Sequence, residues 1–101
     1  MNLAQKIKLI NKDYSFSSIG AVKVTELKTS VFAIKSSVSQ NEFYQAGQQG
    51  FKPEARYDVR LTEYDGQDEL EAAGERLTIY RTFDRDDGRV ELYATKRKGQ
   101  I

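Results

Sequence analysis

The sequence contains no cysteine and no histidine. Without a thiol, the chain can form no disulfide and no zinc–thiolate site, and it has no cysteine nucleophile. Without an imidazole, Ser-His-Asp and Cys-His arrangements and histidine metal sites are excluded. Acid–base chemistry would fall to carboxylates, and these are scattered over expected polar faces and turns. The residue types therefore predict a protein that is not an enzyme and that has no cofactor or metal site.

Long apolar runs and an excess of one charge are also missing. No run approaches the roughly 18–20 apolar residues that span a bilayer, and the N-terminal residues lack the apolar region of a secretion signal, so we expect no membrane contact. The lack of cysteine is typical of a protein made in a reducing cytoplasm. Lys plus Arg number 16 and Asp plus Glu 15. A dedicated duplex-DNA binder usually carries a clear basic excess, which is absent here.

What the 101 residues do contain is alternation of apolar and polar residues, broken by glycine turns. Such a period of two is typical of antiparallel strands with one buried face. We expect a single domain over residues 1–101, mainly β, folded as a small antiparallel β-barrel of about six strands in a meander, with one short helix between the second and third main strands. The expected strands cover residues 6–11, 30–38, 55–63, 69–73, 76–84 and 90–94, before a basic tip at 96–98.

Residues 13–29 break this regularity. Their serines and Gly20 predict a long flexible loop, in which Val22, Val24 and Leu27 could form a short edge strand. Tyr14 and Phe16 lie in this segment. Aromatic side chains on a mobile loop are plausible interface anchors, although they could equally fold back onto the core.

One helix is expected after the strand at 30–38. Ser39 and Glu42 have the spacing of a capping box, in which each side chain binds the backbone N–H of the other residue. Phe43 and Ala46 would form a small apolar stripe, and Gly50 could end the helix in a left-handed conformation. A helix of two to three turns is marginal alone, so it must dock on the sheet.

Two Asp-Gly pairs, at residues 65–66 and 87–88, predict hairpins because both residue types tolerate positive φ. The segment 84–88 superficially resembles the start of a calcium loop. However, its glycine occupies the fifth position instead of the sixth, and Thr95 stands at the twelfth position, where a calcium loop has Glu. A solvated hairpin tip is therefore the better interpretation.

Arg81 shares its expected strand face with Leu77, Ile79 and Phe83, which are apolar. An arginine there must find a partner or reach water. Either it contacts another subunit, or it forms an internal salt bridge with a residue such as Glu91 or Glu63. The full set of candidate partner-binding residues is Tyr14, Phe16, Glu42, Phe43, Tyr44, Arg81, Asp86 and Asp87.

Several segments together resemble the head-closure (head–tail joining, stopper or connector) proteins of tailed bacteriophages. They are residues 37–54 (SVSQNEFYQAGQQGFKPE), 63–66 (EYDG), 76–82 (RLTIYRT) and 91–93 (ELY). Their order carries the resemblance: strand, helix, strand, Tyr-Asp-Gly hairpin, Ile-Tyr-Arg-Thr strand, Glu-Leu-Tyr strand. It covers about residues 30–99.

The resemblance implies a β-barrel protein of the virion neck, present in the host cytoplasm during assembly. Such a protein joins the portal and adaptor ring after DNA packaging, closes the capsid exit and provides a docking surface for tail proteins. It would associate with itself in a ring of about twelve copies, touch the packaged DNA transiently, and could be monomeric alone. A net charge near zero suits a conduit that must not hold phosphates tightly.

Two other functions are compatible with the sequence. A tail-completion protein of the same neck would have similar features. A single-strand nucleic-acid-binding barrel would need a basic groove with exposed aromatic residues, for which Tyr57, Tyr80 and Tyr93 are candidates. A small hydrolase is disfavoured by the missing histidine and cysteine.

Overall fold

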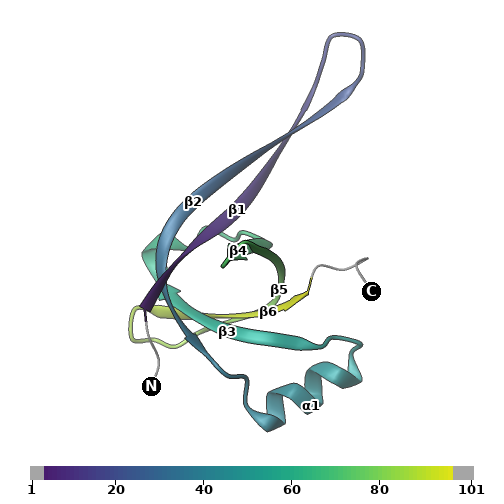
Figure 1. Cartoon of the computed structure of the whole chain (residues 1–101). Coiled ribbons are helices and arrows are strands. Elements are labelled where there is room, and N and C mark those ends of the chain that lie inside the picture. The colour runs from purple at the N-terminus through teal and green to yellow at the C-terminus, as the bar shows by residue number, and fades with distance from the viewer. Residues whose placement is uncertain (1–3, 97–101) are drawn as a thin grey trace.

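The computed structural model describes residues 4–96, so Arg97 and Lys98 of the expected basic tip lie outside the described residues. Six strands, one α-helix and one 3-10 turn follow one another along the chain (Figure 1). In order they are β1 Ala4–Phe16, β2 Val22–Ser36, α1 Gln40–Gln48, β3 Pro53–Arg60, η1 Leu61–Glu63, β4 Glu69–Ala72, β5 Glu75–Asp84 and β6 Arg89–Lys96.

The strands form one closed antiparallel barrel in the order β1-β2-β3-β6-β5-β4. This confirms the expected small β-barrel and the helix between β2 and β3. The simple meander was wrong. The chain makes two three-stranded meanders, β1-β2-β3 and β4-β5-β6, which join where β3 pairs with β6 and where β1 pairs with β4. Closure leaves the barrel itself with few free edges.

Alternating side chains from all six strands fill the barrel, as the period-two pattern predicts. Leu9, Leu70 and Leu92 are fully enclosed. The remaining members of this core are Ile7, Val31, Ala33, Ala55, Tyr57, Val59, Ala72, Leu77, Val90 and Ala94. Alternation along the expected strand over residues 55–63 would place Leu61 on the same face as Val59, but Leu61 is exposed because the chain leaves β3 for the 3-10 turn at that point.

The expected flexible loop over residues 13–29 was wrong. β1 continues to Phe16, and β2 begins at Val22, with thirteen antiparallel pairs that run from Ala4 and Ile34 to Phe16 and Val22. The physical reason is that only the centre of the segment has turn character. On either side, Tyr14 and Phe16 alternate with polar residues, as do Val22 and Val24 across from them, and this is the pattern of a two-stranded ribbon.

The hairpin turns were predicted in part. Asp65-Gly66 joins β3 to β4, which do not pair with each other, so no hairpin forms there. The two-residue turn lies instead at Ala73-Gly74, where both residues have positive φ (53° and 78°), as a type I′ turn requires. Asp87-Gly88 does lie between paired strands, in a four-residue loop that Arg85 N–H closes on Arg89 O.

The helix begins and ends as expected. The Ser39 hydroxyl accepts from Glu42 N–H at 3.1 Å. At the other end, Gly50 has φ 86° and Phe51 N–H donates to Ala46 O, which is the Schellman arrangement. The reciprocal half of the capping box was wrong, because the Glu42 carboxylate binds residues of β5 instead of Ser39 N–H.

Candidate partner-binding arm

A two-stranded arm projects from the barrel (Figure 1). We define the arm as residues 11–29 of the β1–β2 hairpin. On β1 it begins directly after residues 8–10, which pair with β4, and on β2 it ends opposite those residues. With the arm, the described residues extend over 51 Å along the longest axis and 30 and 26 Å along the others. A ribbon of this kind is marginal on its own, so features at its tip and base must hold it.

The tip is closed by a compact turn. Ser17 N–H donates to Ala21 O at 2.8 Å, and the Ser17 hydroxyl accepts from Ala21 N–H at 3.1 Å. Gly20 has φ 84°, a left-handed conformation that costs glycine little. Ile19 lies at the apex with 88% of its surface exposed. Of the serines that predicted a loop, Ser17 and Ser18 lie between the two strands, whereas Ser15 belongs to β1.

The arm has one apolar and one polar face. Cross-strand partners share a face, and Tyr14 lies opposite Val24 while Phe16 lies opposite Val22. Tyr14 is 62% exposed and Phe16 76%. The other face carries Asp13, Ser15, Lys23, Thr25 and, as its one large apolar residue, Leu27. The sequence indicated the two aromatic residues, and it also indicated Val22 and Val24 as part of a short edge strand, which is confirmed as the start of β2. Ile19, which lies in the turn, was missed.

Ion pairs at the base fix the direction of the arm. The Arg76 guanidinium of β5 binds Glu26 of the arm, with one hydrogen bond of 3.2 Å, and binds Glu69 of β4 through Nε at 3.0 Å. Lys12 of the arm lies 3.4 Å from Glu69, and Lys28 lies 3.8 Å from Glu71. Both strands of the arm are therefore tied to β4 and β5 by opposite charges.

These contacts shift the pKa of the groups at the base. The hydrogen bonds from Arg76 lower the pKa of Glu26 below its ordinary value. Burial raises the pKa of Glu69, but hydrogen bonds and charge from Arg76 and Lys12 outweigh burial and leave it lowered. The pKa of Arg76 is raised by its hydrogen bonds to both carboxylates. All three groups are thus held in their charged forms near neutral pH.

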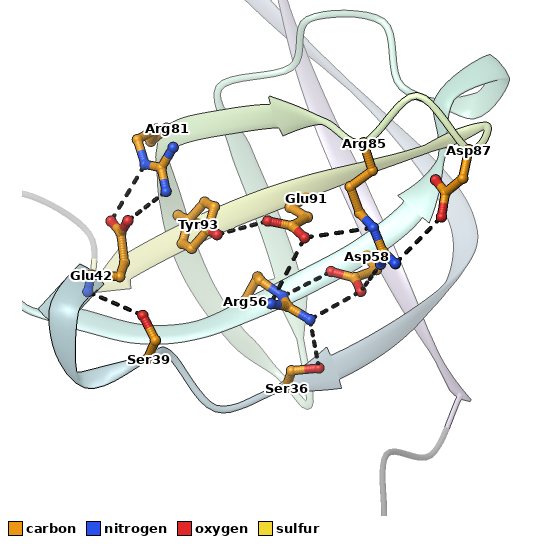
Figure 2. Close-up of polar contacts among 10 residues, drawn as sticks. All are labelled: Ser36, Ser39, Glu42, Arg56, Asp58, Arg81, Arg85, Asp87, Glu91 and Tyr93. Carbon is orange, nitrogen blue, oxygen red and sulfur yellow. Dashed lines mark hydrogen bonds and ion pairs between the residues drawn. The ribbon is translucent and has the colours of Figure 1, made fainter.

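Glu42 was expected to bind a partner, yet it is 9% exposed and occupied within the chain. Its carboxylate accepts from Tyr80 O–H at 2.9 Å. It also accepts from two nitrogens of Arg81 (Figure 2). Burial, followed by the bond to Glu42, raises the pKa of Tyr80. Phe51, just after α1, stacks on Tyr80 with centroids 5.0 Å apart. Glu42 therefore clamps the helix to β5.

Arg81 shares a face with Phe83, as the alternation predicted, but not with Leu77 and Ile79. A β-bulge between Ile79 and Arg81 inserts one unpaired residue, so Arg81 lies opposite Tyr93 on the outer face. Its guanidinium lies 4.1 Å above the Tyr93 ring. The internal salt bridge was the better of the two interpretations of Arg81, but its partner is Glu42, not Glu91 or Glu63.

A second polar network crosses the outer face of β3 and β6 and includes Arg85 of the β5–β6 loop (Figure 2). Asp58 is buried and accepts from Arg56 Nε at 3.0 Å and from Arg85 Nη1 at 3.1 Å. Glu91 accepts from Tyr93 O–H at 2.7 Å. Burial lowers the pKa of Arg56, but the charges of Asp58 and Glu91 outweigh burial and raise it. Each buried charge has a partner, so this network is structural.

The remaining candidate residues lie apart from the arm. Asp86 and Asp87 lie in the β5–β6 loop, where Asp87 lies 3.3 Å from Arg85 and Asp86 adopts a left-handed φ of 65°. Phe43 and Tyr44 are exposed on α1, at the end of the molecule opposite the arm tip (Figure 1). The eight candidates therefore form no single site.

The three tyrosines considered for base stacking are occupied. Tyr57 is enclosed in the core, Tyr80 is stacked on Phe51, and Tyr93 is buried beneath Arg81. A stacking platform needs ring faces that are open to the solvent. This arrangement argues against a single-strand nucleic-acid-binding face at these positions.

No family model matches the chain, and no curated protein matches it at a significant level. Within residues 4–96, no helix has the length and apolar character needed to cross a bilayer. In the same residues, no group of three or more acidic side chains is arranged to hold a metal ion.

Proposed function

We propose that this chain is a structural protein of the neck of a tailed bacteriophage. In this role it joins the portal and adaptor ring after DNA packaging, closes the capsid exit and presents a docking surface to tail proteins. Its copies form a ring around the channel, the packaged DNA touches them transiently, and the protein ends up in the virion at the head–tail interface. It performs no catalysis.

The arm is the observation that carries this proposal. Its apolar face and tip expose large side chains that a free protein would not keep in water without a use, since contiguous exposed apolar surface usually marks a binding site. The candidates on the arm, Tyr14 and Phe16, are aromatic residues of the kind that anchor interfaces. The arm projects well beyond the barrel, which suits contact with a macromolecule more than with a small ligand (Figure 1).

Two further features support the neck role. The closed barrel with its helix between β2 and β3 is the fold that the resemblance to head-closure proteins implies. The net charge of +1 gives no general affinity for phosphates, as suits a DNA conduit. A tail-completion protein of the same neck would share these features, and the experiment below separates the two.

Interruption of the gene in its phage, with complementation from a plasmid, tests the proposal. We expect full heads that leak DNA and finished tails that do not attach, both seen by electron microscopy, with rescue by the native gene. Phe16→Ser in the plasmid copy should fail to rescue, whereas Glu54→Ser, at an exposed site on the barrel, should rescue fully. Tails that never assemble would favour tail completion. Normal virions would refute both roles.

A further inference from the structure

The two edges of the arm lack strand partners. In the described residues, the edge of β1 that faces away from β2 pairs only over residues 8–10, with β4. The edge of β2 that faces away from β1 pairs only over residues 34–36, with β3. The β1 edge from residue 11 to 16 and the β2 edge from residue 22 to 33 therefore offer backbone N–H and C=O groups to another strand. Proteins usually cover or interrupt long edges of this kind, because they invite pairing.

We propose that these edges pair with each other between neighbouring copies of the chain, the β1 edge of one arm lying against the β2 edge of the next. β1 and β2 run in opposite directions on the two sides of each arm. Arms that stand side by side with their tips in one direction therefore continue a single antiparallel sheet, with every new pair antiparallel as well.

Charges on the polar face select the register of this pairing. Asp13 on β1 and Lys23 on β2 are exposed, and within one chain Asp13 lies opposite Thr25, not opposite Lys23. Neither takes part in the ion pairs at the base of the arm, which use Lys12, Glu26 and Lys28. In the proposed register, Asp13 of one copy lies directly opposite Lys23 of the next, where opposite charges stabilise a cross-strand pair.

The contact is head to tail, so each copy uses two different edges and can bind a neighbour on both sides. Repetition of such a contact gives a ring or a filament instead of a two-fold dimer. The apolar faces of successive arms then form one continuous surface, led by Tyr14 and Phe16. The inference deepens the proposed function, because it rests on the assembly of copies into a ring and specifies how they contact one another.

The absence of native cysteine makes cross-linking a clean test. In the double variant D13C/K23C, the two cysteines of one chain are diagonal neighbours, about 7–8 Å apart and somewhat closer at Cβ, which is too far for a disulfide. Two cysteines that lie directly opposite each other in neighbouring chains are close enough to form one. We expect the oxidised full-length protein, at about 1 mM, a concentration typical of tethered neighbours, to give a ladder of dimers, trimers and larger species on a non-reducing denaturing gel.

Matched controls fix the register and the symmetry. D13C/L27C keeps both cysteines on the same face but displaces one by about 13 Å along the strand, and should give roughly tenfold less product. D13C mixed with K23C should give cross-linked dimers, whereas either variant alone should not. A ladder no stronger than that of D13C/L27C overturns the inference, as does equal dimer formation by D13C alone, which would indicate two-fold pairing.

A charge exchange gives a second readout that needs no oxidation. D13K alone and K23D alone should each weaken self-association in sedimentation, and their equimolar mixture should restore it, because every interface then joins opposite charges. Failure of the mixture to restore association overturns the register. These measurements use purified protein, so they are independent of the phage experiment. If the arms pair but the phage attaches its tails without this protein, the proposed function fails and the pairing stands. If the phage needs the protein but the arms do not pair, the pairing fails and the proposed function stands.

Discussion

Replacement of Glu42 by Gln should cause a measurable loss of stability, because the Glu42 carboxylate clamps α1 to β5. The glutamine keeps the length and shape of the side chain and can still accept from Tyr80 O–H. It removes the negative charge that faces Arg81. The perturbation therefore isolates the charge of the clamp and leaves its packing in place.

The structure sets the size of the effect. A hydrogen bond to a charged group contributes about 1.5–3 kcal/mol, and Glu42 receives such bonds from Arg81 in a largely buried position. The Arg81 side chain is 43% exposed, however, so solvent screens part of the attraction. We expect Glu42→Gln to lower the free energy of unfolding by about 1–2 kcal/mol, which for a domain of this size lowers Tm by roughly 4–8 °C per kcal/mol.

Urea and thermal unfolding at pH 7 measure this loss. Glu54→Gln is the matched control, because Glu54 is exposed on β3, and it should change the free energy of unfolding by less than about 0.5 kcal/mol. A double-mutant cycle of Glu42→Gln with Arg81→Gln should show a coupling of at least about 0.5 kcal/mol. Equal effects of Glu42→Gln and Glu54→Gln, together with no coupling, would refute the clamp.

Other consequences can be measured on the same apparatus. Arg76→Gln removes hydrogen bonds that lower the pKa of Glu69 below the ordinary carboxyl value of 4.5. A carboxylate with a lowered pKa stabilises the folded state above pH 4.5, and this contribution is lost as the pH falls through the lowered pKa. The variant should therefore lose less stability from roughly pH 5 to 3 in urea titrations, and an unchanged slope would count against the network. Ala73→Asn should raise the free energy of unfolding by about 0.5–1 kcal/mol, because asparagine tolerates the φ of 53° at this position better than alanine does. Thermal unfolding measures the change, and a lower Tm would contradict this reasoning. Phe16→Ser should leave the free energy of unfolding within about 0.5 kcal/mol of the native value, whereas Leu9→Ala should cost about 2–5 kcal/mol in denaturant titrations; a large loss from Phe16→Ser would mean that the arm belongs to the core.

The barrel could be predicted from the sequence because its signals are local. Alternation over Ala55, Tyr57 and Val59, and again over Val90, Leu92 and Ala94, indicates strands with one buried face, and each of these residues is buried. The Ser39 cap and the left-handed Gly50 are equally local and were predicted correctly. Features that depend on neighbouring residues within a turn or two of the chain are visible in one sequence.

The features that were missed depend on tertiary contacts. The bulge at Tyr80 shifts the alternation by one residue, and nothing in residues 76–84 marks its position, so Arg81 was assigned to the wrong face. Glu42 had a local role available at Ser39, but Tyr80 and Arg81, which are distant in sequence, offer stronger donors. Asp65-Gly66 had hairpin chemistry, but strand order in a closed barrel decided the pairing instead.

The arm was missed for a different reason. A strand is usually identified by the burial of one face, and the outer half of the β1–β2 hairpin buries neither. Serines near the tip then led to the prediction of a loop over the whole segment. The same lack of burial is what makes Tyr14 and Phe16 candidates for binding, so the error and the candidate site have one physical origin.

The strand order of the barrel also governs when the chain can fold during synthesis. The β1–β2 hairpin needs only neighbouring residues and can form within microseconds of leaving the ribosome. β3 can pair with β6 only later, because paired residues such as Val59 of β3 and Val90 of β6 are far apart in the sequence. The chain between them must be synthesised first. For that interval the unfinished sheet of β1, β2 and β3 is open to other molecules, and β6, the last of the described strands along the chain, closes it.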